Sequence, residues 1–251
     1  MLPRPTHDVG GAPAFFLDVD GTLLDIAEAP DRVHVPPRVV DVLARLAGSF
    51  GGAVALVSGR PIADLDRLLS PLRLPCAGLH GAERRDARGE LRRHGMDGAL
   101  DAARTALSSF CAAHPGTLLE DKGAALALHY RLAPAAESQA RRAVGRALAG
   151  LGPAFALQEG KCVLEIKPAG SSKAHAIEEF MAEAPFAGRV PVFAGDDVTD
   201  EDGFRAVNRL GGLSVRVGGD GRTAATSALG SVDEVIGWLS GWSSTAPEVT
   251  G

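Results

Sequence analysis

Residues 15–22 read Phe15-Phe16-Leu17-Asp18-Val19-Asp20-Gly21-Thr22 and mark the end of the first predicted strand. The apolar run before Asp18 is typical of a strand that is buried on both faces. Asp18 and Asp20 lie two residues apart, a spacing that places both side chains on one face of a strand. Gly21 allows the chain to turn sharply after them. Aspartates at a strand end also commonly cap the next element, so this stretch alone leaves both interpretations open.

A second acidic loop lies far along the chain and reads Phe193-Ala194-Gly195-Asp196-Asp197-Val198-Thr199-Asp200-Glu201-Asp202. It also follows an apolar run, and the carboxyl ends of parallel strands meet at one edge of a sheet. Carboxylates gathered there would repel one another, each pair at about 4 Å by roughly 4 kcal/mol at an effective dielectric of about 20. A divalent cation would offset this repulsion. Mg²⁺ is expected because the ligands are carboxylates and no Cys or His lies nearby in the sequence.

Part of the second loop has a simpler interpretation. Thr199 with Asp202 three residues later fits a capping box, so these residues could merely begin a helix. That interpretation leaves Asp196 and Asp197 unexplained, because both would stand before the helix. A calcium-binding EF-hand loop is excluded, since aligning Gly203 with the loop glycine puts Val198 at the first ligand position.

The segments around the two loops predict the fold. Residues 53–57 form another apolar strand, and Pro61 suits the first turn of the helix that follows. Helical spacing is seen after Pro36, and residues 190–194 and 213–217 are further strand candidates, each with a helix after it. Apolar strands alternating with helices predict an α/β, Rossmann-like core, in which helices cover both faces of a parallel sheet.

The middle of the chain has a different pattern. Short strands joined by tight turns are expected at residues 117–120 and 124–130, and again at 154–158 and 162–166, with helical segments before each pair. This pattern predicts an inserted α+β cap domain at residues 84–165, between core segments 1–83 and 166–251. The cap would begin with a polar hairpin around Gly89. The arginines of this hairpin are expected to form a solvated face: Arg84, Arg85, Arg88, Arg92 and Arg93.

Two further strand-to-helix junctions carry groups suited to an anion. Ser58-Gly59-Arg60 offers a hydroxyl and free backbone N–H groups before a helix, although Ser58 could be only an N-cap. Lys173 lies in the first turn of a predicted helix, where a cation opposes the helix dipole. A lysine facing a dianion would justify that cost, whereas an exposed lysine would simply be misplaced.

Composition restricts the class of protein. The chain has 251 residues and a net charge of −5, so no general affinity for nucleic acid or for an anionic membrane is expected. Three scattered cysteines, with no CxxC pair, favour a reducing compartment. No apolar segment resembles a signal peptide or a membrane span. A cytoplasmic location is therefore expected.

The four junctions together resemble the haloacid dehalogenase-like phosphohydrolases, through DVDGT at residues 18–22, SGR at 58–60, Lys173 and GDD at 195–197. The resemblance implies that Asp18 is the nucleophile that forms an aspartyl-phosphate, and that Asp20 is the general acid and then the base. It implies Mg²⁺ as cofactor, bound by Asp18, by the backbone carbonyl of Asp20 and by Asp196, with Asp197 as a further ligand and Asp200 in support. Ser58, Gly59 and Lys173 would bind the phosphate.

The predicted cap narrows the family. Residues 79–83, 120–123, 129–131 and 160–168 are similar to the corresponding segments of trehalose-6-phosphate phosphatases, as is GDDVTDED at 195–202. This resemblance implies hydrolysis of trehalose 6-phosphate, a small-molecule sugar phosphate. The sequence shows no synthase-like glycosyltransferase region, so a stand-alone phosphatase is expected, and it is expected to be a monomer. Lys167 departs from the pattern, because the family more often has Arg there. The implied substrate-binding residues are Arg60, His80, Glu120, Lys122 and Glu165.

Two alternatives stay open at this point. A related enzyme could act on another sugar phosphate, such as sucrose phosphate or mannosylglycerate phosphate. A catalytically silent sensor of sugar phosphates is disfavoured, because a sensor needs neither the nucleophile Asp18 nor the acid Asp20. The charged residues of the cap, without the resemblance, could equally form an ordinary solvated hairpin face.

Overall fold

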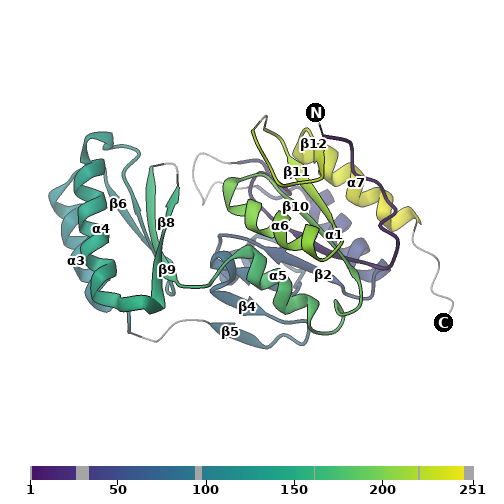
Figure 1. Ribbon diagram of the computed structural model, residues 1–251, viewed down its shortest axis with the longest axis horizontal. Coiled ribbons are helices and arrows are strands. Elements are labelled where there is room, and N and C mark those ends of the chain that lie inside the picture. Colours follow the sequence, from purple (N-terminus) through teal and green to yellow (C-terminus); the bar gives the residue numbers. More distant parts are fainter. Residues whose placement is uncertain (1, 27–33, 94–97, 161, 220, 246–251) are drawn as a thin grey trace. The chain divides into compact units, whose positions relative to one another are not determined.

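The computed structural model describes residues 2–26, 34–93, 98–160, 162–219 and 221–245. The chain divides into two compact units (Figure 1). The core unit comprises Met1–Leu91 and Ser172–Gly251, and the cap unit comprises Arg92–Ser171. Among the described residues, every helix is too short or too polar to cross a bilayer.

An eight-stranded sheet forms the centre of the core unit, in the order β12-β11-β10-β1-β2-β3-β4-β5. The strands from β12 to β3 are parallel to their neighbours, and β4 runs antiparallel to β3. The strands are β1 (Pro13–Leu17), β2 (Val54–Val57), β3 (Cys76–Gly78), β4 (Glu83–Arg85), β5 (Leu91–Arg93), β10 (Val190–Gly195), β11 (Leu213–Val217) and β12 (Ser227–Leu229).

Alternation along β1 explains why helices cover both faces of this sheet. Phe15 and Leu17 enter one apolar cluster with α1 (Pro37–Ser49), α2 (Ile62–Leu68) and α7 (Val232–Thr245). Ala14 and Phe16 point to the other face, where they pack with α5 (Lys173–Met181) and α6 (Glu201–Arg209). Successive strand residues face opposite ways, so an apolar strand needs cover on both sides. The predicted Rossmann-like core is confirmed.

The register of β1 and β10 brings the two acidic loops together. Leu17 pairs with Ala194, and the N–H of Asp18 donates to the carbonyl of Ala194 at 3.0 Å. Both strands run in the same direction, so both loops leave the sheet at the same edge. The pairing of these two strands therefore brings together two loops that lie far apart in the sequence.

The cap unit contains a four-stranded antiparallel sheet in the order β6-β7-β9-β8. Helices α3 and α4 pack against this sheet through a separate apolar cluster that includes Leu107, Leu128, Val144 and Ile166 (Figure 1). Its elements are α3 (Asp101–Ala113), β6 (Leu118–Asp121), β7 (Leu126–His129), η3 (Pro134–Ala136), α4 (Glu137–Leu151), η4 (Gly152–Ala154), β8 (Phe155–Gly160) and β9 (Val163–Pro168).

The observed division differs from the expected boundaries at both ends of the insertion. The hairpin of β4 and β5 extends the core sheet, so the first boundary falls after Leu91 and not after residue 83. Strand β9 pairs with β7 as far as Ile166 and with β8 as far as Pro168, so the second boundary falls after Ser171 and not after residue 165. The polar sequence of this hairpin of β4 and β5 gave no indication that it belongs to the core sheet, because a hairpin at the edge of a sheet needs no continuous apolar run.

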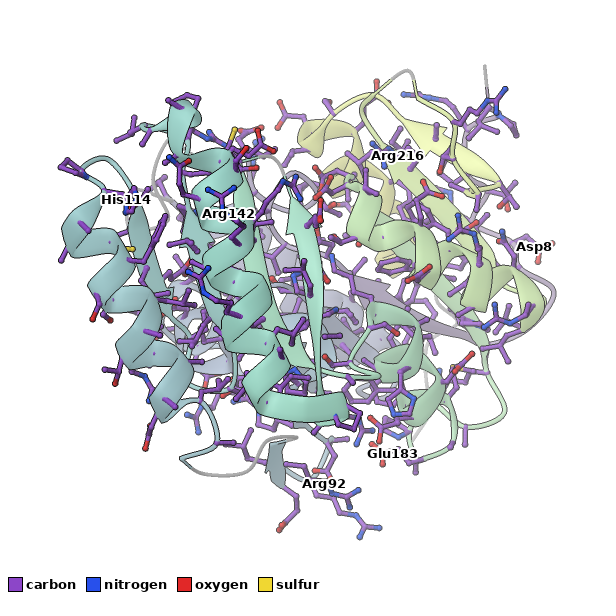
Figure 2. All side chains as sticks on the ribbon, turned by 60° about the vertical axis from the view of Figure 1, so that its left-hand side comes forward. Asp8, Arg92, His114, Arg142, Glu183 and Arg216 are labelled. Carbon is purple, nitrogen blue, oxygen red and sulfur yellow. The ribbon has the colours of Figure 1, made fainter. Side chains whose placement is uncertain are left out.

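The arginine-rich hairpin is not a uniformly solvated face, and that prediction is wrong for Arg84 and Arg85. Arg84 is only 2% exposed; its guanidinium lies 4.1 Å from the centre of the Phe180 ring and pairs with Glu183. Arg85 is held in a two-bonded ion pair by Asp66 on α2. In contrast, Figure 2 shows Arg92 extending away from the ribbon, and it is exposed.

We expect Arg84→Ala to lower the free energy of unfolding by about 2–4 kcal/mol, the range for truncating a long buried side chain. The variant loses the packing over Phe180 and the ion pair with Glu183. Arg92→Ala, in the same arginine-rich stretch, is the control and should change stability by no more than about 0.5 kcal/mol. Urea unfolding of both variants measures the difference, and equal losses would contradict the structural role of Arg84.

Candidate active site

Asp18 stands directly after β1 and is 5% exposed. Its Oδ1 lies 2.8 Å from Nζ of Lys173. A buried carboxylate loses its hydration, and a partner with the opposite charge offsets that loss only at such short range. Asp18 is therefore fixed by β1 through its backbone and by Lys173 through its side chain.

Lys173 is the first residue of α5, and Ser172 is the N-cap, accepting a hydrogen bond from the N–H of His175 at 3.1 Å. The ammonium group is buried and donates to Oδ1 of Asp200 at 2.6 Å. A cation at a helix N-terminus opposes the dipole of that helix. The two carboxylates of Asp18 and Asp200 offset this cost, so the interpretation of Lys173 as an exposed, misplaced lysine is excluded.

Asp200 organises the second acidic loop. Its Oδ2 accepts from the backbone N–H groups of Asp196 at 3.0 Å and of Asp197 at 2.9 Å. Asp197 in turn caps the short helix η5 (Val198–Asp200), and its side chain accepts from the N–H of Val198 at 2.7 Å. The capping box therefore consists of Asp197 and Asp200, and the expected box of Thr199 and Asp202 is wrong.

Three carboxylates converge at the shared edge of β1 and β10. One oxygen each from Asp18, Asp196 and Asp200 lies within 4.8 Å of the others. Gly21 makes room for this approach, because a Cβ there would lie 2.1 Å from Oδ2 of Asp196 and its φ is +80°. Thr22 Oγ1 lies 3.5 Å from Oδ1 of Asp196. Asp197, expected among the metal ligands, is exposed and turned to its capping role.

The titration behaviour reflects an excess of negative charge. Burial raises the pKa of Asp18 well above its ordinary value, and Asp200 and Asp196 add to the increase, whereas Lys173 opposes it. Burial and Asp200 also raise the pKa of Asp196, to about 6. Burial lowers the pKa of Lys173, but Asp18 and Asp200 outweigh that effect and raise it. One lysine thus faces three carboxylates, and the cluster favours a further proton or a cation.

Asp20 takes a different partner from Asp18. The guanidinium of Arg60 holds it in two parallel hydrogen bonds, from Nε to Oδ2 and from Nη2 to Oδ1, both at 2.6 Å. The Arg60 side chain is 11% exposed, and that of Asp20 is 36% exposed. The carboxyl group of Asp20 is therefore oriented by Arg60, and it stands nearer to solvent than Asp18 does.

Ser58 follows β2 and is 1% exposed. Its Oγ accepts from the N–H of Arg60 at 3.2 Å. The N-cap of α2 is Pro61, which makes no side-chain capping bond, so Ser58 is not the cap of that helix. Gly59 lies under the ring of His80, because a Cβ at Gly59 would approach Nε2 of that ring to 2.8 Å. The core unit thus brings the Ser58 loop and His80 into contact.

Of the three predicted substrate-binding residues of the cap, Glu120 lies on β6, Lys122 directly follows β6, and Glu165 lies on β9, which is separated from β6 by β7 alone. Lys122 Nζ donates to Oε2 of Glu165 at 3.2 Å, and His129 pairs with Glu120 at 2.9 Å. Glu165 is buried, and within the described part of the chain its Oε1 has no hydrogen-bond partner. A buried oxygen of this kind could accept a hydrogen bond from a hydroxyl group of a bound ligand. Lys161, in the same motif, lies outside the described residues.

Two contacts were not predicted from the sequence, namely the pairing of Arg60 with Asp20 and the bridging position of Lys173 between Asp18 and Asp200. The signal for Asp200 was present, since it lies four residues after Asp196 in a loop already singled out. No sequence signal links Arg60 to Asp20, because 40 residues separate them. The predicted site residues of the core and those of the cap belong to different compact units.

Sequence comparison identifies relatives along most of the chain. The profile of the trehalose-phosphatase family matches residues 16–233. The trehalose-6-phosphate phosphatase of Escherichia coli (strain K12) is 48% identical over 235 residues, which cover 93% of this chain and 88% of the relative.

Structural comparison agrees. The crystal structure of a trehalose-6-phosphate phosphatase related protein superposes with a TM-score of 0.78 at 25% identity, covering 92% of this chain and 96% of that chain. A phosphatase of the haloalkanoate (HAD) superfamily from Bacteroides thetaiotaomicron superposes with a TM-score of 0.63 at 18% identity, over 96% and 98% of the two chains, which shows a common fold. The family resemblance inferred from the motifs is confirmed, and the chain belongs to the trehalose-phosphatase family.

Proposed function

We propose that this protein hydrolyses trehalose 6-phosphate to trehalose and phosphate through an aspartyl-phosphate. One observation carries the proposal: Asp18, at the edge where the two acidic loops meet, is buried in contact with Lys173 and beside Asp196 and Asp200. The E. coli relative, at 48% identity, is a trehalose-6-phosphate phosphatase by name. The buried cluster supplies the phosphate chemistry, and the relatives indicate the sugar.

The first half-reaction transfers the phosphoryl group to the protein. A carboxylate oxygen of Asp18 attacks phosphorus, a bond from that oxygen to phosphorus forms, and the bond from phosphorus to the sugar oxygen breaks. Asp20 donates a proton to the departing sugar oxygen, so trehalose leaves as the neutral alcohol. Asp20 must exchange its contact with Arg60 for the leaving oxygen at this step.

The second half-reaction releases phosphate. Asp20, now a carboxylate, takes a proton from water, and the oxygen of that water bonds to phosphorus. The bond between phosphorus and Asp18 breaks, which restores the Asp18 carboxylate and the proton on Asp20. Lys173 and Ser58 are assigned to the phosphate oxygens, since both are buried beside the end of β1 or β2. Cationic and hydroxyl donors placed there would stabilise the charge that develops on the phosphoryl group.

The donor set of the core unit fits Mg²⁺. All three converging groups are carboxylates, and hard cations of this kind prefer oxygen ligands. We assign the ion to Asp18 and Asp196 with the backbone carbonyl of Asp20, because Asp200 already accepts from Lys173 and from two backbone N–H groups. When bound, Mg²⁺ would neutralise charge between Asp18 and the incoming phosphate. The capping role of Asp197 argues against direct ligation by its side chain.

The cap residues are assigned to the sugar. Glu120 and Glu165 present carboxylates from β6 and β9, and Lys122 presents an ammonium group just after β6. Vicinal hydroxyls can donate hydrogen bonds to the carboxylates and accept them from the ammonium group. Sugar binding by Arg60 and His80 stays a prediction. A cytoplasmic location and a monomeric state also stay predictions, which fractionation and light scattering would test.

A panel of substrates tests the proposed function. Phosphate release is measured with trehalose 6-phosphate, sucrose phosphate, mannosylglycerate phosphate and p-nitrophenyl phosphate, each with Mg²⁺ and with EDTA. The proposal expects the highest kcat/KM for trehalose 6-phosphate and loss of activity with EDTA. A preference for another sugar phosphate would identify the related-enzyme alternative. Binding without turnover of any substrate would identify a sensor.

We expect Mg²⁺ to stabilise the protein more at pH 7.5 than at pH 5. Asp196 has a pKa of about 6 in the folded chain, above its ordinary value in the unfolded chain. Its contribution to stability in the metal-free protein is therefore complete below about pH 4 and is lost as the pH rises through about 6. Above that pH the carboxylate is free for the ion, and Mg²⁺ at about 100 times its Kd should raise Tm by about 5–10 °C.

Differential scanning fluorimetry at both pH values, with Mg²⁺ and with EDTA, measures this shift. Asp196→Asn is the matched variant, because it keeps the shape of the side chain and removes its titration. Equal Mg²⁺ stabilisation at pH 5 and pH 7.5 would contradict the assignment of Asp196 to the ion.

We expect the cap to select the disaccharide. Glu120→Ala and Lys122→Ala should each lower kcat/KM for trehalose 6-phosphate by ~1.5–3 kcal/mol of transition-state stabilisation, the scale of a hydrogen bond to a charged group. Hydrolysis of p-nitrophenyl phosphate should change far less, because this small ester contains no sugar for these residues to bind. Arg142→Ala, at an exposed position of α4 (Figure 2), is the control for a lost cap charge. Equal losses on both substrates would assign Glu120 and Lys122 to folding of the cap.

A further inference from the structure

We propose that Glu83 is a positioning residue for the phosphate-binding side of the active site. Glu83 is the last residue of the segment 78–83, which we call the clasp. The clasp joins β3 to β4 and contains the short helix η2 (Leu79–Gly81). The inference rests on the proposed function for its meaning, since Ser58 and Lys173 are the groups assigned there to phosphate.

The backbone of the clasp is strained at two residues that are not glycine. Leu79 has a φ of 51° and His80 a φ of 55°, both in the left-handed region. That region is unfavourable for side chains with a Cβ, and surrounding contacts must hold such residues in place. The ends of the clasp are fixed by cross-strand pairing of Gly78 with Glu83. A tight left-handed turn is thus held between two paired strands, at the margin of the candidate site.

One side of the clasp is hydrogen-bonded to the loop that carries Ser58. The N–H of His80 donates to the carbonyl of Ser58 at 2.9 Å, and the N–H of Leu79 donates to the carbonyl of Arg60 at 3.0 Å. Oε2 of Glu83 accepts from the N–H of Ile62 at 2.9 Å. These three hydrogen bonds fix the loop at residues 58, 60 and 62. Each of them comes from the clasp.

The other side of the clasp packs on the start of α5. Gly81 has a φ of +98°, and a Cβ at this position would lie 3.0 Å from the carbonyl oxygen of Ser172. Ser172 is the N-cap of α5, and Lys173 follows it directly. The clasp therefore touches both elements that carry the proposed phosphate-binding groups. Its conformation determines the separation of Ser58 from Lys173.

Glu83 is the side chain that ties this arrangement to β4. Glu83 is 7% exposed and accepts a hydrogen bond from the N–H of Ile62, the first residue of α2. An N–H at this position has no acceptor within its own helix. Pro61, the N-cap, provides no side-chain capping bond. A helix cap alone would be met by a local Ser or Asp. A carboxylate supplied from β4, 21 residues away, additionally fixes the loop against the clasp.

The test compares three substitutions of one side chain. Glu83→Ala removes the acceptor, Glu83→Gln keeps an oxygen acceptor at the same reach, and Glu83→Asp keeps the charge but shortens the reach. The measurements are kcat and KM for trehalose 6-phosphate and for p-nitrophenyl phosphate, the inhibition constant of inorganic phosphate, Tm, and hydrogen exchange of the Ile62 amide. Glu183→Gln is the matched control, because Glu183 (Figure 2) pairs with Arg84, the next residue of β4.

We expect Glu83→Ala to lower kcat/KM by about 10- to 100-fold on both substrates alike, since a displacement of about 1 Å can cost that much. Phosphate should bind more weakly and the Ile62 amide should exchange faster. Glu83→Gln should restore kcat/KM to within about threefold of the wild type, an estimate from the retained hydrogen bond. Glu83→Asp should fall between the two. Glu183→Gln should lower Tm without changing kcat/KM.

Two results would overturn the proposal. The first is a Glu83→Ala protein with a lower Tm but with wild-type kcat/KM and phosphate inhibition, which would make Glu83 a structural cap only. The second is a folded Glu83→Gln protein that is more impaired than Glu83→Asp, which would assign the effect to the charge of Glu83 and not to its reach. If Glu83→Ala does not fold, the comparison of the Gln and Asp variants decides the question. A wild-type protein inactive on every ester would refute the proposed function alone, because phosphate binding and Ile62 exchange would still test the clasp.

Discussion

Lys173 places one buried positive charge between Asp18 and Asp200, and the arrangement of the core site depends on this bridge. The two carboxylates come from opposite ends of the chain, and both are almost completely removed from water. Ion pairs of this kind contribute little net stability, because dehydration of the charges consumes most of the attraction. Breaking one by removing a partner is costly. The bridge therefore gives the site its specific geometry and makes it intolerant of change.

The sheet makes the bridge possible. Parallel pairing of β1 with β10 brings the two acidic loops to one edge of the sheet. Helix α5 packs on the face of the sheet that carries Phe16, and Lys173 lies in its first turn. Burial and the neighbouring carboxylate of Asp200 raise the pKa of Asp196 to about 6, and Lys173, which faces three carboxylates, offsets only part of this increase. An unbalanced negative cluster is suited to a divalent cation and, with that cation, to a phosphate dianion. Fold, charge and proposed chemistry are thus linked by one local imbalance.

The sequence predicted the parts of this site that have local signals. Apolar runs ending in Asp18 and in Asp196 identified two strand ends, and the alternation of strands with helices identified the parallel core. Features made by distant residues could not be predicted. Arg84 is buried because Phe180 and Glu183, nearly a hundred residues later, surround it. Asp20 is oriented by Arg60 through a contact between separate loops. The cap is Asp197 and not Thr199 because the carboxylates of Asp197 and Asp200 each accept a hydrogen bond from the other's backbone N–H, which no local signal in the sequence reveals.

A crystal structure of the protein with Mg²⁺ and beryllium fluoride, which imitates a phosphoryl group on a carboxylate, tests the roles of Asp18 and Lys173 most directly. We predict beryllium bonded to an oxygen of Asp18, a magnesium ion on Asp18 and Asp196, and the ammonium group of Lys173 within hydrogen-bond distance of a fluoride. Beryllium fluoride attached to another residue, or a magnesium ion that does not touch Asp18, would contradict these roles.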